Sequence, residues 1–315
     1  MPTPSDPNIE ERVLSRGRWD PVENRPKRSV FGNFSTTEGD AAERSRRRAQ
    51  ADMALSRRDP AALRHAREVA LARAFLYRFL ACAYEDPAAE SWEWLCNPAT
   101  SASAAAAWRL LAESVPGAGA DSPVPVFQLA GLESFRSACA AVFGHAARGS
   151  CPLNEIEYGD LNADPLFQPH RLADLAAFYR AFGLEVTPDA GERLDHISFQ
   201  LEFMCVLAAK EACALETNEP EDFLVLCRDA QKKFLREHPG RWLPAFARRL
   251  GGATKDPLLQ ALAAFTGTFI LGECARFSIQ PGADDLLLRP VDEAAESLCA
   301  SCGLANLPPG ALRTT

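Results

Sequence analysis

The chain has 315 residues, of which 47% are hydrophobic and 24% are charged, as is ordinary for a globular protein. Its formal net charge is −8. Residues 1–60 carry 12 Lys and Arg against 10 Asp and Glu, so the rest of the chain has a net charge of −10. A body this acidic excludes a broad basic face for nucleic acid. It suits a partner that carries positive charge.

The ten cysteines are scattered through apolar helical patterns, which indicates a reducing compartment rather than a secreted disulfide scaffold. No apolar segment follows the first charged residues, so we expect no secretory signal. The longest apolar run, 261–272, is shorter than the roughly 20 residues that a bilayer-spanning helix needs. The sequence therefore predicts a cytoplasmic protein without membrane insertion.

Residues 1–60 are predicted to be a flexible N-terminal extension. Pro, Ser, Arg and Asp dominate this segment and apolar residues occur singly, so it buries too little surface to offset the entropy lost on ordering. The helical pattern begins at Asp59-Pro60, which reads as an N-cap followed by a first-turn proline. We expect one all-helical domain over residues 61–290, followed by a C-terminal tail, 291–315.

From Pro60 onward the apolar residues recur at helical spacing, and no useful stretch shows the two-residue alternation of a strand. The segment 149–170 has Gly, Pro, Asn and Asp at short intervals, which predicts a long loop, and such loops are often functional. The predicted fold is all-α, a single multi-helix bundle. Its helices are expected from Pro60 to about 85, then at 88–96, 100–115, 126–147, 171–183, 193–216, 220–237, 241–250 and 256–277.

The segment 193–216 is the most informative helix. It is apolar nearly all round, which predicts a place at the centre of the bundle. Asp195, Ser198 and Glu202 nevertheless share one narrow face at helical spacing. In one interpretation Asp195 caps the helix and Glu202 pairs with an arginine. In the other, Asp195, His196 and Glu202 line a polar notch that receives another molecule.

Two further functions stay open on the residues alone. A helical hydrolase would use Asp195, His196 and Glu202, although no Ser or Cys nucleophile stands near them in sequence. A metal-dependent helical regulator would use Cys299 and Cys302, which supply two thiolates and thus half of a structural zinc site. Those two cysteines can equally be unligated or redox-active. No resident cofactor is predicted.

Three segments in order resemble the TorD/DmsD/NarJ-like family of chaperones. They are CPLNEIEYG at 151–159, LADLAAFYRAFGLEV at 172–186 and ERLDHISFQLEFMCVLAAKEA at 192–212. The Asp-His pair at the helix start, with LEFM later in the same helix, resembles the family signature. Cys-Pro and Glu-x-Glu-Tyr in the preceding loop resemble the branch that serves type II enzymes. The resemblance covers about residues 65–280; the long N-terminal extension and the C-terminal Cys-x-x-Cys depart from the family pattern.

The resemblance implies an all-helical cytoplasmic chaperone, not an enzyme, for molybdenum oxidoreductases of the DMSO reductase superfamily. Its partner would be the apo catalytic subunit, including an Arg-bearing signal peptide. The chaperone would assist cofactor insertion, folding and export proofreading. In some members a guanine nucleotide or the molybdenum cofactor also binds.

An acidic notch with an aromatic wall suits an Arg-bearing peptide, through charge-assisted hydrogen bonds and cation–π contact. Glu202 is a candidate client-binding residue because it lies on the helical face described above. The other client-binding positions that the resemblance implies are Asp195, His196, Glu155, Glu157, Tyr158, Phe178, Tyr179 and Gly183.

Overall fold

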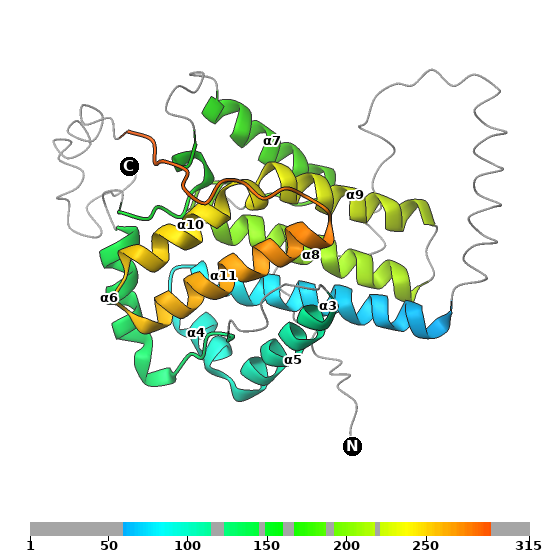
Figure 1. The fold of residues 1–315 in the computed structure, drawn as a ribbon, viewed down its shortest axis with the longest axis horizontal. Coiled ribbons are helices and arrows are strands. Elements are labelled where there is room, and N and C mark those ends of the chain that lie inside the picture. Colours follow the sequence, from blue (N-terminus) through cyan, green and yellow to red (C-terminus); the bar gives the residue numbers. More distant parts are fainter. Residues whose placement is uncertain are drawn as a thin grey trace, which may run out of the picture.

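The computed structural model describes residues 59–114, 123–144, 149–159, 167–186, 192–217 and 221–290. These residues form helices and two isolated β-bridges but no strand, so the predicted all-α fold is confirmed for them (Figure 1). The predicted N-terminal extension, Cys299 and Cys302 lie outside the described residues. The helices are α3 (Pro60–Tyr84), α4 (Ala89–Cys96), α5 (Pro98–Ser114), α6 (Leu132–Phe143), α7 (Phe167–Ala181), α8 (Ile197–Glu216), α9 (Glu221–Glu237), α10 (Pro239–Ala253) and α11 (Pro257–Arg276).

The centre of the bundle is the long contact between α3 and α8, which lie side by side (Figure 1). The Asp59 side chain accepts a hydrogen bond from the amide of Ala61 at 2.9 Å and so caps α3. Leu76 on α3 and Leu201 and Met204 on α8 are fully buried. The prediction that residues 193–216 form a central helix is therefore confirmed, with the helix itself beginning at residue 197.

Helices α10 and α11 pack against each other and cover one side of this pair (Figure 1). By length and composition α11 could cross a membrane, and among the described helices it is the only one that meets this criterion. Half of its most apolar window is buried inside the fold, however, and Phe265 and Phe269 are fully enclosed. This burial is the behaviour expected of a core helix.

A buried charge cluster, which we call the Arg73 cluster, joins four helices. Arg73 on α3 donates to Glu273 on α11 at 2.8 Å, to Glu211 on α8 at 3.0 Å and to Gln231 on α9 at 2.7 Å. The Tyr77 hydroxyl donates to Glu273 at 2.9 Å. Burial opposes ionisation of Glu211, but the neighbouring arginines outweigh it and hold the pKa of this carboxyl below its usual range.

After α11 the chain turns back along α10 as a non-helical segment, residues 279–290, which we call the strap (Figure 1). The amide of Gly282 donates to the carbonyl of Gly240 at 2.9 Å. A Cβ at Gly282 would lie only 1.9 Å from the carbonyl oxygen of Arg241, so glycine is required for this close approach. The strap is thereby anchored on α10 before it reaches the loop described next.

Candidate functional site

The loop 149–159 lies against the segment that leads into α8. The amide of Glu155 donates to the carbonyl of Asp195 at 3.1 Å, and the amide of Ile197 donates to the carbonyl of Leu153 at 2.9 Å. Asn154 and His196 form one of the isolated antiparallel bridges. Two of the three segments that carry the family resemblance thus meet through backbone hydrogen bonds.

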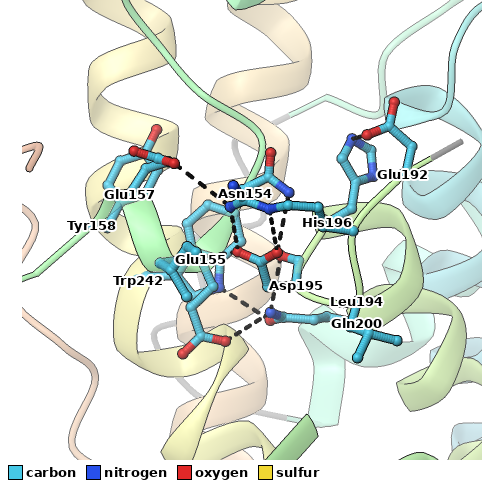
Figure 2. Close-up of polar contacts among 12 residues, drawn as sticks. Asn154, Glu155, Glu157, Tyr158, Glu192, Leu194, Asp195, His196, Gln200 and Trp242 are labelled. Atoms are coloured by element: carbon cyan, nitrogen blue, oxygen red, sulfur yellow. Dashed lines mark hydrogen bonds and ion pairs between the residues drawn. The ribbon is translucent and has the colours of Figure 1, made fainter. Parts of the chain in front are cut away.

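Asp195 is fully buried at the centre of this contact, and we call its surroundings the Asp195 cluster (Figure 2). Arg193 donates two hydrogen bonds to the carboxylate, from Nε to Oδ1 at 3.1 Å and from Nη2 to Oδ2 at 3.0 Å. The amide of Ile156 donates to Oδ2 at 3.1 Å, and the side-chain amide of Asn154 donates to Oδ1 at 3.3 Å. One carboxylate therefore binds both the loop backbone and its own neighbouring arginine.

The expected face shared by Asp195, Ser198 and Glu202 does not exist, because Asp195 precedes the helix. The bridge to the loop keeps His196 extended, with φ −63° and ψ 140°, and α8 begins one residue later. The N-cap is His196, whose Nδ1 accepts from the amide of Ser198 at 3.4 Å. The capping role expected of Asp195 is therefore wrong.

Glu202 differs in exposure from the two residues with which it was grouped. Its side chain is exposed, whereas Asp195 and His196 are buried. No arginine pairs with Glu202 in the part of the chain that the structure describes, so the expected ion pair is not found there.

His196 is 2% exposed, and its Nδ1 lies 2.7 Å from the Ser198 hydroxyl. Burial lowers the pKa of the imidazole from 6.5 to about 4, with partial opposition from Asp195. The ring is therefore neutral at pH 7. On its outer side, Nε2 is 4.0 Å from the carboxylate of Glu192, which is half exposed.

Glu155, on the other side of the loop, is also fully buried. Its Oε2 accepts from the side-chain amide of Gln200 at 2.7 Å and lies 2.9 Å from Nδ1 of His238. Arg241 donates to Oε1 at 3.2 Å, while the indole of Trp242 donates to Gln200 at 3.1 Å. Burial would raise the pKa of Glu155, but His238 and the arginines overcome this effect and lower it.

The α10 side of this arrangement was not predicted from the sequence. His238, Arg241 and Trp242 stand in a HisProGlyArgTrp run at the start of the helix, and nothing in that run names Glu155 as its partner. One sequence signal for such partners was available: Glu155 lies in a loop beside Ile156 and Tyr158. A carboxylate that is buried with such neighbours needs cationic or hydrogen-bonding partners.

The predicted aromatic residues pack in the interior. The Tyr158 hydroxyl donates to the carbonyl of Pro152 at 2.8 Å, and its ring centroid lies 5.0 Å from that of Trp242. The Tyr179 hydroxyl donates to the carbonyl of Leu194 at 3.0 Å, so α7 is tied to the segment before Asp195. The Phe178 ring packs edge-on against Phe234 and His238.

Gly183 ends α7. Its φ is 76°, in the left-handed region that favours glycine, and the amide of Leu184 donates to the carbonyl of Tyr179 at 2.9 Å. The structure gives this glycine a helix-terminating position and leaves it exposed.

Three charged residues reach solvent beside the buried cluster, and we call them the rim: Glu157, Glu192 and Arg193. Arg193 Nη2 lies 3.5 Å from the carboxylate of Glu157. The Arg193 side chain is 47% exposed and that of Glu157 is 16% exposed. The Glu192 side chain is 48% exposed. Figure 2 shows Glu157 and Glu192 on opposite sides of the buried Asp195.

No described group of three or more His, Cys, Asp or Glu side chains has the arrangement of a metal site. Cys151 is buried, with Sγ 3.6 Å from the Tyr158 hydroxyl. Cys299 and Cys302, the metal candidates predicted from the sequence, both lie beyond the described residues.

Comparisons with known proteins give the same assignment as the motifs. Residues 97–248, which run from α5 into α10, match the family model described as nitrate reductase delta subunit. The chain is 35% identical over 92 residues to the selenate reductase assembly chaperone protein of Thauera selenatis, which is 29% of this chain and 43% of that relative. It is 31% identical over 104 residues to the perchlorate reductase assembly chaperone protein of Dechloromonas aromatica, 33% of this chain and 45% of that relative.

A third relative, the chlorate reductase assembly chaperone protein of Ideonella dechloratans, is 35% identical over 80 residues, 25% of this chain and 39% of that protein. The matches span less than half the length of each relative. No solved structure matches the chain. The matched region contains the loop, the Asp195 cluster and all of α8, and together with the three relatives it confirms the resemblance to TorD/DmsD/NarJ-like chaperones.

Proposed function

We propose that this protein is a system-specific chaperone that binds the immature catalytic subunit of a molybdenum-containing reductase before export. Three relatives named as reductase assembly chaperones support this function. The family match also contains the loop 149–159 and the start of α8, where Asp195 makes its buried polar contacts. In this role the protein would act in the cytoplasm, hold the subunit while the molybdenum cofactor is inserted, and delay its export.

The main structural support for the proposal is that the polar atoms of the Asp195 carboxylate already have hydrogen-bond partners within the protein. Every oxygen of the Asp195 carboxylate is hydrogen-bonded within the protein, and His196 is neutral and enclosed. Such groups fix a surface in place rather than attack a substrate. A rigid surface loses little entropy on binding a partner, which favours recognition. This arrangement supports binding and release over the hydrolase alternative.

Within the proposed surface, the buried and exposed candidates would have different tasks. Glu155, Asp195, His196 and the three aromatic residues would position the loop and α7. The partly exposed Glu157 and the exposed Glu202 would contact an Arg-bearing segment of the client, since carboxylates form strong paired hydrogen bonds with guanidinium groups. The net charge of −10 outside residues 1–60 would draw a basic segment toward this surface.

The proposal also includes the domain organisation. Residues 61–290 would act as one helical unit, flanked by the N-terminal extension and the C-terminal tail. The described helices support a single unit, because the Arg73 cluster joins α3, α8, α9 and α11 through side chains far apart in sequence.

The test is affinity purification of the full chain from its native host, followed by mass spectrometry and metal analysis. We expect a large reductase catalytic subunit that lacks molybdenum. Deleting the gene should leave that subunit synthesised but inactive and poor in cofactor. Recovery of no reductase subunit, together with unchanged reductase activity in the deletion strain, would contradict the proposal.

Complementation of the deletion strain separates recognition from folding. The wild-type gene should restore reductase activity. Glu202→Gln, at an exposed position, should lower the restored activity without changing the amount of chaperone. Lys232→Gln, an exposed change on α9 outside the proposed surface, is the matched control and should restore activity fully.

A further inference from the structure

The strap pairs with the outer edge of the loop. The amide of Gly159 donates to the carbonyl of Leu287 at 3.2 Å, and the amide of Arg289 donates to the carbonyl of Glu157 at 2.9 Å. Tyr158 and Leu288 stand opposite each other in this antiparallel bridge. These are main-chain contacts, so they depend on an extended conformation and carry little sequence information.

The contacts that hold the strap along the loop are partly exposed. Leu286 and Leu288 are partly buried against the core, whereas Leu287 between them is 58% exposed. The ion pair between Asp284 and Arg248, at 3.1 Å, joins side chains that are both more than 60% exposed. Such a pair contributes little to stability. Two backbone hydrogen bonds, a hydrogen bond of 3.5 Å from Arg249 to the carbonyl of Leu286 and two half-buried leucines are among the contacts that hold this part of the strap.

The loop side of the pairing is fixed independently of the strap. Tyr158 is fully buried, and Glu155 and Asp195 tie the same turn to α8 and α10. If the strap left, the amide of Gly159 and the carbonyl of Glu157 would lose their partners while the turn stayed in place. An edge of this kind is a template for another extended segment.

We propose that the Glu157–Gly159 edge is a docking site for an extended segment of the client, and that residues 286–290 are its exchangeable resident occupant. The incoming segment would carry apolar side chains at alternate positions, as the strap does at Leu286 and Leu288. The edge is continuous with the rim, because Glu157 belongs to both. The identity of the incoming segment rests on the proposed chaperone function; the exchange itself does not.

The test uses the full-length chain and a fluorescent peptide with the sequence of residues 283–290, ADDLLLRP. In the wild type the tethered strap has an effective concentration in the millimolar range and excludes a micromolar peptide. Arg289→Pro removes the amide that bonds Glu157, and Leu288 before it is already extended, as a residue before proline must be. The matched control is Arg289→Ala, which removes the side chain but keeps the amide.

Fluorescence polarisation should show Arg289→Pro binding the peptide roughly tenfold more tightly than the wild type or Arg289→Ala does. The loss of one backbone hydrogen bond of ordinary net strength shifts an equilibrium by about that factor. Gly282→Ala is a second way to release the strap, since its Cβ would collide with Arg241. Circular dichroism identifies which of the two variants retains its helices. Peptide binding that is equally weak in the folded releasing variant and in the wild type overturns the exchange.

A second experiment measures binding of the reductase catalytic subunit to the same variants. The subunit should bind the releasing variant more tightly than the wild type, and the peptide should compete with it. A peptide that binds without competing shows that the client does not use the edge, which overturns the docking proposal while the chaperone function stands. If no variant binds a catalytic subunit, the chaperone function fails, and the peptide measurements still decide whether the edge exchanges its occupant.

Discussion

The Arg73 and Asp195 clusters are built from the same kinds of residue but hold different parts of the molecule. Arg73, Glu211 and Glu273 join side chain to side chain across helices that already share a hydrophobic core. Asp195 instead binds the backbone amide of Ile156 and so fixes a loop. The first cluster supports the fold, whereas the second shapes a surface. Disrupting each in turn should therefore separate global stability from recognition.

The largest expected effect is on the Arg73 cluster. Arg73→Met leaves Glu211 and Glu273 buried without their shared cation, and removing one partner of a buried ion pair typically costs about 3–5 kcal/mol. Urea unfolding followed by circular dichroism would measure the loss. The control is Arg67→Met on the same helix, where the pair with Glu216 is partly exposed and should contribute less than about 1 kcal/mol. Equal losses in both variants would contradict the distinction.

The next largest effect is a pH dependence of the free energy of unfolding, caused by His196 beside Asp195. The pKa of His196 is lowered to about 4 in the folded protein and is near 6.5 when unfolded, so the unfolded chain binds more protons between these values. Stability is fully present above pH 6.5 and falls as the pH drops toward 4, by at most about 3 kcal/mol from this residue. Urea unfolding of the wild type at several pH values measures the slope.

The matched variant for this slope is His196→Asn, since asparagine also caps helices but does not titrate. The slope between pH 6.5 and 4.5 should be shallower in His196→Asn than in the wild type. Glu155 and Glu211, whose pKa values are also lowered, titrate below their usual value of 4.5 and retain their contribution in both proteins. An unchanged slope would mean that another group causes it.

A smaller global effect is expected for Asp195→Asn. The variant keeps the size of the side chain but weakens the bonds to Arg193 and Ile156, which should reduce stability by about 1–3 kcal/mol. Helicity should stay nearly unchanged. Hydrogen exchange at the Ile156 amide should speed up far more than exchange in α3, and binding of the reductase subunit should weaken. Global unfolding would instead make Asp195 a residue of the fold alone.

The smallest effect on stability is expected for Glu202→Gln. The side chain is exposed on α8 and lies in neither cluster, so the free energy of unfolding should change by less than about 0.5 kcal/mol. Calorimetric titration with the reductase subunit should nevertheless show weaker binding if Glu202 contacts a basic segment. Unchanged affinity would remove Glu202 from the proposed surface and leave the rim as the acidic contact.

The helices were predictable because their signals are local. The cap and proline at Asp59-Pro60 marked the start of α3, and both α3 and α11 begin within one residue of the expected positions. The predicted helix 126–147 was too long. Residues 123–128 are non-helical, and α6 runs only from Leu132 to Phe143. There Phe127 packs edge-on between Phe79 and Trp92, a contact across the chain that periodicity does not report.

The candidate site was predictable in its members but not in its geometry. The motifs brought Glu155, Asp195 and His196 into one set, and the structure places them together. Their roles depended on where α8 begins, and that boundary is set by the bridge between Asn154 and His196. A contact between residues 42 positions apart leaves no mark on helical spacing, so Asp195 was wrongly placed on a helical face with Glu202.

The position of α11 in the chain has a consequence for synthesis. Among the described helices, the one apolar enough to enter a bilayer is also the last to leave the ribosome. By then α3, which meets it at Tyr77 and Phe269, and α10, which packs along it, have already been made. Because a domain folds as a unit once its chain has been made, α11 emerges when the helices that it packs against are available for contact. The time during which membrane-targeting factors could capture it is thereby kept short.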